Sequence, residues 1–236
     1  MKSTPKPYLI WYGDWNQTNN SDTPAGKTLV KTFLGDLNNS SYFQINTSYS
    51  ATGGVGIPAE ITVTAPHNST LSDNGVLSVV TNAIKTWGGA DSNGVYFVLT
   101  SSDIAKSGFC TSYCGWHTRA TIQGVDIKYS FVGNANRCLS SCAAQTVGPN
   151  GNAGVDGMLS VLAHELEETV TDPDLNAWYD SQGAENADKC AWTFGQNQTL
   201  MSTGAFYNMT MNNRHYLIQR NLSANSLCYV SAGGQQ

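Results

Sequence analysis

Blocks of consecutive apolar residues predict several buried strands. The clearest blocks lie at residues 8–12, 95–100 and 127–132, and each is rich in aromatic and β-branched side chains and is followed by Gly or Ser. Uninterrupted apolar runs of this length are typical of strands that are buried on both faces of a sheet. Shorter runs at residues 42–49 and 61–63 predict two further strands.

Other segments repeat their apolar residues at the spacing of a helix. Residues 25–37 and residues 71–87 place apolar side chains every three or four positions, which predicts two amphipathic helices. A third helix is expected to follow the Gly-rich stretch 148–157 and to end or bend at Pro173, because proline disrupts the helical hydrogen bonds.

This alternation of strands and helices predicts the α/β class. We expect a single domain over residues 1–236, with a central sheet flanked by helices and a disulfide-bonded, loop-rich C-terminal part. The chain contains no internal repeat and no low-complexity linker that would mark a second domain.

Composition narrows the possible functions. Only 12% of the residues are charged, the formal net charge is -5, and no run of Lys and Arg is interleaved with aromatic residues. These features argue against nucleic-acid binding and favour an extracellular protein. No apolar run is long enough to cross a bilayer, so we expect no membrane span. Residues 1–7 lack the apolar core of a signal peptide, so either a signal has been removed or the chain is not secreted.

The cysteines favour disulfide bonds over a zinc cluster. Two pairs have three intervening residues, a spacing that thiolate ligands could also use, but the low charge and the sequons described below favour an oxidising compartment. Six cysteines permit many pairings, and we expect the local ones. The expected bonds are Cys110 to Cys114, Cys138 to Cys142, and Cys190 to Cys228.

Asn-X-Ser/Thr sequons for N-glycosylation are more frequent than this composition would produce by chance, which supports secretion and a glycoprotein. They begin at Asn16, Asn19, Asn38, Asn39, Asn46, Asn68, Asn197, Asn208 and Asn221.

The third helix carries the clearest chemical motif of the chain. His164 and Glu168 are four residues apart, so their side chains project from the same face of the helix one turn apart. This is the arrangement of the HExxH zinc-hydrolase helix with its second His replaced by Glu. In that motif the Glu that follows the first His is the general base, which assigns this role to Glu165. A solvated surface helix is the alternative interpretation.

The charge pattern of this helix favours a bound cation. Glu165, Glu167 and Glu168 place three negative charges late in a helix, where the helix dipole disfavours them. On a helical wheel, His164 and Glu168 lie opposite the stripe of Leu and Val residues, so they face either solvent or a cleft.

A zinc ion normally has three protein ligands, so a third must come from elsewhere. Asp188 and Glu185 are the leading candidates because their loop is held by Cys190, and His117 is a further candidate. Asp172 is expected to serve the turn before Pro173 instead. An oxygen-rich set would suit a structural calcium ion, with His164 as a bystander. Its members would be Glu168, Asp172, Asp174, Asp188 and Glu185.

Several short blocks, in order over most of the chain, resemble the phosphate-induced protein 1 family, which includes the plant Exordium proteins. The resemblance implies an extracellular or cell-wall-associated protein, linked in plants to growth and to brassinosteroid or phosphate responses. Plant members typically lack the His-Glu pair, whereas microbial members of the family resemble this chain more closely at His164 and Glu165. The matching blocks are Tyr12-Gly13-Asp14-Trp15, Tyr96 to Asp103, Gly108-Phe109-Cys110, Cys114-Gly115-Trp116-His117, Phe131 to Asn134 with Cys138 and Cys142, Pro149 to Asn152, Gly154 to Met158, and Thr169 to Pro173.

Two functions follow from these observations. The first is a secreted zinc-dependent hydrolase of peptide, amide or ester bonds, with Glu165 as general base. The second is a non-catalytic extracellular protein that binds cell-wall polysaccharide or self-associates, in which any zinc or calcium is structural. The second function would use exposed tryptophans to stack on sugars. The candidates are Trp11, Trp15, Trp116 and Trp178.

Overall fold

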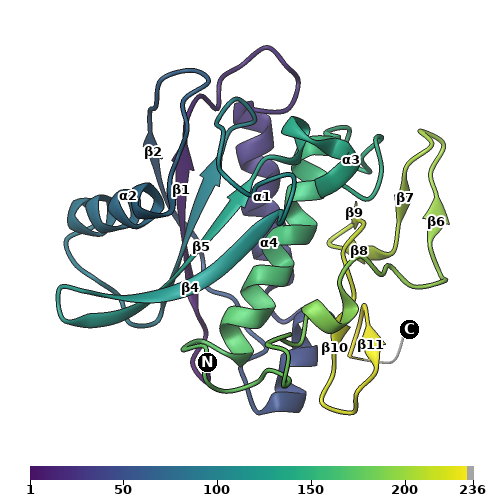
Figure 1. Ribbon diagram of the computed structural model, residues 1–236. Coiled ribbons are helices and arrows are strands. Elements are labelled where there is room, and N and C mark those ends of the chain that lie inside the picture. The colour runs from purple at the N-terminus through teal and green to yellow at the C-terminus, as the bar shows by residue number, and fades with distance from the viewer. Residues whose placement is uncertain (233–236) are drawn as a thin grey trace.

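A computed structural model describes residues 1–232 as an α/β fold built on one five-stranded sheet (Figure 1). The predicted domain 1–236 therefore includes four residues, 233–236, that lie outside the described part. The strand order is β2-β1-β3-β5-β4. The strands are β1 (Lys6–Tyr12), β2 (Ala59–Val63), β3 (Gly94–Thr100), β4 (Gly115–Ile122) and β5 (Val125–Gly133).

The first four strands of this order are parallel, and only β4 runs antiparallel, beside β5. Gln123 and Gly124 form the two-residue turn between β4 and β5, and both have positive φ angles, of 55° and 76°. Positive φ at both positions is the signature of the tight turn that joins antiparallel strands. Strand β4 was not predicted, because its burial pattern is irregular and its apolar residues are few.

Three long helices cover the two faces of the sheet. They are α1 (Pro24–Leu37), α2 (Asp73–Thr86) and α4 (Ala153–Thr171). Leu9 and Trp11 of β1 pack with α1 and α4, whereas Tyr8 and Ile10 pack with α2 on the opposite face. Alternating residues of one strand are thus buried on both faces, which explains the continuous apolar blocks of the sequence.

The predicted strand at residues 42–49 is wrong. This segment forms a 3₁₀ helix, η1 (Phe43–Tyr49). The Ser40 hydroxyl accepts a hydrogen bond from the Phe43 amide, and the Thr47 and Ser48 hydroxyls donate to nearby backbone carbonyls. Such local side-chain bonds compete with pairing in a sheet, and the apolar spacing alone did not reveal them.

The C-terminal part is loop-rich and disulfide-bonded, as predicted, and it also contains short hairpins and a short 3₁₀ helix. Figure 1 shows these hairpins beside α4, away from the central sheet. The short elements between and after the long helices are η2 (Ala135–Arg137), α3 (Leu139–Cys142), η3 (Asp188–Cys190), β6 (Thr199–Leu200), β7 (Phe206–Tyr207), β8 (Met209–Met211), β9 (Arg214–Tyr216), β10 (Asn221–Leu222) and β11 (Cys228–Tyr229).

All six cysteines form disulfides, and two of the three predicted pairings are wrong. The bonds are Cys110–Cys138, Cys114–Cys142 and Cys190–Cys228, so only the third was predicted correctly. The Cys114–Cys142 bond ties the start of β4 to α3, and the Cys110–Cys138 bond runs beside it. Cys110 and Cys114 precede the β4–β5 hairpin in the chain, and Cys138 and Cys142 follow it. The hairpin therefore brings the first two cysteines next to the last two.

Among the described residues, no helix is both long and apolar enough to span a membrane.

Candidate metal centre

Helix α4 is the central support of the site, because nearly every one of its residues is buried. The Asn152 side chain caps its first turn by accepting a hydrogen bond from the Val155 amide. Its polar face carries His164 and Glu168, which do not face open solvent. They face β4 and the segment 184–190 across a cleft, one of the two arrangements that the helical wheel allowed.

Three side chains converge at His164. Its Nε2 atom lies 3.1 Å from Glu168 Oε1 and 3.3 Å from Asp188 Oδ1. The three donor atoms all lie within 4.8 Å of one another, close enough to bind one metal ion. Asp188, a leading candidate for the third ligand, lies within this group.

A second group of three converges at His117 of β4. The His117 Nε2 atom lies 2.8 Å from Glu185 Oε2 and 3.5 Å from Glu168 Oε2. These donors also lie within 4.8 Å of one another. Glu168 therefore belongs to both groups, with one carboxylate oxygen toward each imidazole.

Backbone hydrogen bonds fix the segment that carries the two downstream acids. The Asp188 amide donates to Glu168 Oε1 over 3.0 Å, and the Glu185 amide donates to Asp188 Oδ2 over 3.1 Å. Such outer contacts hold carboxylate ligands in one orientation and tune their charge. The Cys190–Cys228 disulfide holds the end of this segment, as the sequence suggested.

Glu165 lies beside both groups but makes no side-chain hydrogen bond with the described protein atoms. Burial raises the pKa of this carboxyl group to about 8; the charge of His164 lowers it and that of Glu168 raises it. A carboxyl group whose pKa is near neutrality can exchange a proton at working pH, which general base catalysis requires.

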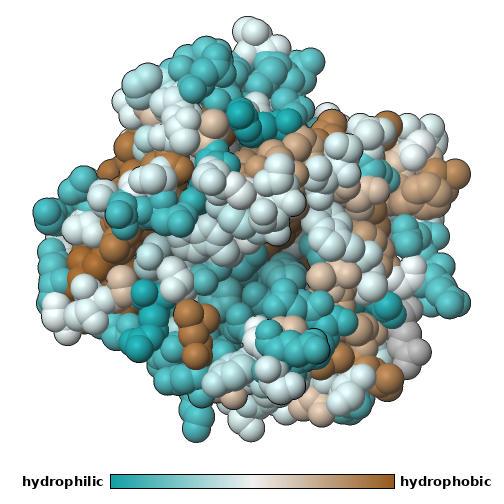
Figure 2. Space-filling model, in the orientation of Figure 1, coloured by the Kyte–Doolittle hydropathy of each residue, from teal (hydrophilic) through white to brown (hydrophobic). Residues whose placement is uncertain are grey.

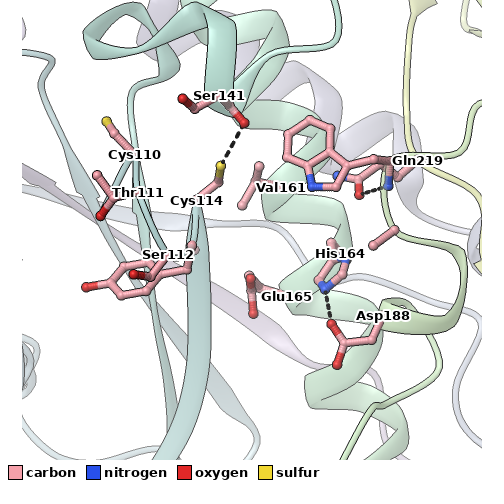
Figure 3. A pocket seen from close by; sticks show the side chains of 14 residues that line it. Cys110, Thr111, Ser112, Cys114, Ser141, Val161, His164, Glu165, Asp188 and Gln219 are labelled. Carbon is pink, nitrogen blue, oxygen red and sulfur yellow. Dashed lines mark hydrogen bonds and ion pairs between the residues drawn. The ribbon is translucent and has the colours of Figure 1, made fainter. Parts of the chain in front are cut away.

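A cavity of about 310 Å³ opens at Glu165 and His164. Figure 3 shows both side chains reaching from α4 into it, with Asp188 below them and the loop around Ser112 and Cys114 across the opening. Gly115, Trp192 and Gln219 also line it; Gly115 belongs to one of the blocks that carry the family resemblance, and no sequence signal pointed to the other two. Figure 2 shows the hollowed centre of this face with hydrophilic residues at its floor.

The site concentrates negative charge around its two imidazoles. Burial lowers the pKa of His117, but the hydrogen bond to Glu185 and the charges of Glu165, Glu185 and Glu168 outweigh burial and raise it to about 9. For His164, burial likewise opposes the shift, and the charge of Glu168 and the contact with Asp188 raise its pKa well above the ordinary value. The surrounding carboxylates therefore favour a positive charge at both imidazoles.

Two of the five acids suggested for a calcium site, Asp172 and Asp174, belong to neither group of neighbouring donor atoms. Asp172 Oδ1 accepts hydrogen bonds from the Asn176 and Ala177 amides, the turn role that was expected for it. Asp174 lies 2.8 Å from Lys128 Nζ in an ion pair. Both carboxylates are thus used elsewhere, and the remaining acids lie against imidazoles, which calcium does not favour.

Two of the four tryptophans suggested for sugar stacking are buried. Trp11 and Trp15 pack against each other in the core and donate hydrogen bonds to Glu60 and to the Leu99 carbonyl. Trp116 and Trp178 are half-buried against Tyr129 and Tyr49. Trp11 and Trp15 are therefore not accessible for stacking on a sugar.

Three of the nine sequon asparagines are buried in this fold. Asn46, Asn208 and Asn221 are buried, and the last two make side-chain hydrogen bonds inside the protein. A sequon pattern carries no information about burial. The other six asparagines are exposed: Asn16, Asn19, Asn38, Asn39, Asn68 and Asn197.

Comparison with known proteins identifies the family. The family model for the phosphate-induced protein 1 conserved region matches residues 1–229 of this chain. The chain belongs to the phosphate-induced protein 1 family. This confirms the resemblance that the short blocks of the sequence indicated, and it extends that resemblance over almost the whole chain.

The chain is similar to several plant members of this family. The chain is similar to Protein EXORDIUM-like 5 of Arabidopsis thaliana (27% identity, 80% of this chain and 60% of the relative) and to EXORDIUM-like 3 of the same plant (28%, 89% and 74%). It is also similar to Protein PHOSPHATE-INDUCED 1 of Nicotiana tabacum (32%, 55% and 51%). The chain thus spans only about half to three quarters of these relatives. No solved structure matches it.

Proposed function

We propose that this member of the phosphate-induced protein 1 family is an extracellular zinc-dependent hydrolase of peptide or other amide or ester bonds. The observation that carries the proposal is the convergence of Glu168 and Asp188 on His164 Nε2, beside a buried Glu165 that opens to a cavity. The three disulfides support an oxidising, extracellular location.

The donor set fits zinc. Zinc binds His nitrogen and carboxylate oxygen at about 2.0–2.2 Å in a tetrahedron, whose edges are therefore about 3.3–3.6 Å long. The contacts of His164 with Glu168 and Asp188, at 3.1 Å and 3.3 Å, are close to such edges. One imidazole, two carboxylates and an open cavity are the ligands and free position of a catalytic site.

When bound, zinc would act as a Lewis acid and lower the pKa of a coordinated water. The protein's own residues supply the rest. Glu165 faces the cavity directly beside His164, the position from which a carboxylate would accept a proton from an attacking water and return it to a leaving group. His164, Glu168 and Asp188 would hold the ion, and the half-exposed Trp192 borders the opening where a substrate chain would lie.

Metal content and hydrolysis test this proposal separately. Purified protein is loaded with zinc, freed of excess ion and analysed by mass spectrometry of the elements. We expect tightly bound zinc in the wild type and in the control His215→Ala, whose imidazole stacks on Tyr207 away from the site. We expect a large loss in His164→Ala. A wild type without bound zinc would end the proposal.

Hydrolysis is measured with labelled casein, a quenched-peptide library and simple aryl esters. We expect Glu165→Gln to keep its zinc and to lose at least about 100-fold of any hydrolysis, the range that a general base contributes. Equal activity of this variant and the wild type would remove Glu165 from the mechanism.

A further inference from the structure

The two oxygens of one carboxylate serve two different imidazoles. Glu168 Oε1 lies against His164, and Glu168 Oε2 lies against His117. A carboxylate in this position has the geometry of a bridge between two metal ions. Pairs of metal ions about 3.5–4 Å apart are a recurrent feature of hydrolytic sites, including aminopeptidases.

The five donor residues do not form one coordination sphere. Within residues 1–232, they separate into His164, Glu168 and Asp188 on one side and His117, Glu168 and Glu185 on the other. In the part of the chain that the structure describes, no such group of neighbouring donor atoms contains both imidazoles. His117 and Glu185 are therefore not alternatives to Asp188 as the third ligand of a single ion, because they gather at the other oxygen of Glu168.

An unpartnered oxygen points to a missing ligand in the second group. Glu185 is nine-tenths buried, and its Oε1 atom has no hydrogen-bond partner, although Oε2 contacts His117. A buried carboxylate oxygen without a partner is costly, and a cation would satisfy it. This observation is independent of the bridging geometry of Glu168.

The charge balance of the cluster agrees with two dications. Four carboxylates surround the two imidazoles, and His residues are neutral when they bind a metal. The three ligand carboxylates, Glu168, Glu185 and Asp188, would still carry a net negative charge with one dication, and a second dication would offset it. A buried cluster with uncompensated charge is unfavourable. The four carboxylates are Glu165, Glu168, Glu185 and Asp188.

We propose that the site is a dinuclear zinc centre in which Glu168 bridges one ion held by His164 and Asp188 and a second held by His117 and Glu185. This inference rests on the proposed function for its first ion and adds the second. The competing role of His117 is that of a protonated cation, which would hold Glu168 and Glu185 by charge alone.

The stoichiometry of bound zinc tests the second ion. The intact chain is stripped with a chelator, loaded with zinc, and analysed for zinc per chain. We expect two zinc ions in the wild type and one in both His117→Ala and Glu185→Gln. The matched control His215→Ala is expected to bind two. Circular dichroism and thermal unfolding verify that each variant is folded.

Spectroscopy supplies a second readout that does not depend on activity. X-ray absorption of the zinc-loaded protein should show a zinc–zinc vector at about 3–4 Å in the wild type, and this vector should vanish in His117→Ala. One zinc per chain in the wild type, or an unchanged count in His117→Ala, overturns the dinuclear centre while leaving the His164 site intact. No bound zinc at all overturns both proposals.

Discussion

Gly115 of β4 lies directly against the carboxylate of Glu165. A Cβ atom at this position would be 3.0 Å from Glu165 Oε1 and 2.7 Å from Val161 Cγ1. The absence of a side chain at the start of β4 therefore lets the strand and α4 approach closely. This approach brings His117, two residues further along the strand, to Glu168.

Gly115→Ala should therefore disturb the site. We expect it to lower the free energy of unfolding by about 1–3 kcal/mol, because an added methyl in a packed region forces shifts. Thermal unfolding measures the loss, and zinc affinity should fall with it. The control is Gly35→Ala in α1, where an added Cβ meets no atom within 4 Å. That change should be neutral or stabilising, because Ala is the better helix former. A Gly115→Ala protein as stable as the wild type would contradict the close packing.

The disulfide pairing is directly measurable. Mass spectrometry of non-reduced peptides should find Cys110 linked to Cys138 and Cys114 linked to Cys142. The double variant Cys114→Ser/Cys142→Ser should lose about 2–4 kcal/mol of stability, as is typical of a native disulfide. It should also weaken zinc binding, because this bond holds the start of β4 at the cavity. Peptides linking Cys110 to Cys114 would refute the observed pairing.

The metal-free protein should become less stable as pH rises from about 6.5 to 9. The folded protein holds the proton of His117 more tightly than the unfolded chain does, since the pKa rises from 6.5 to about 9. The stabilisation is therefore complete below pH 6.5 and is lost as pH rises through about 9. Chemical unfolding in a chelator at several pH values measures this slope, which His117→Gln should reduce. A slope equal in both proteins would exclude His117 as its source.

Only the sequon asparagines that are exposed in the fold should carry glycans. When the chain is produced in a secretory host, glycopeptide mapping should find glycans only among the six exposed sequons. Asn46, Asn208 and Asn221 should remain bare in the folded product, because their side chains are buried. Full occupancy at Asn221 would contradict its contact with Glu167 on α4.

Much of the fold could be predicted from local patterns. The blocks at residues 95–100 and 127–132 are strands buried on both faces, and such burial leaves a continuous apolar run in the sequence. The spacing of His164 and Glu168 likewise needs only the helical repeat to place both side chains on one face. These features are determined by residues close together in the chain, so the sequence by itself determined them.

Only the tertiary structure decided how distant segments meet. Strand β4 pairs with β5, and this pairing, rather than any local pattern, joins Cys110 to Cys138 and carries His117 to Glu168. The backbone bonds of Glu185 and Asp188 then place two further acids at the same carboxylate. The sequence supplied the candidate ligands, but their division into two groups depends on contacts between elements far apart in the chain.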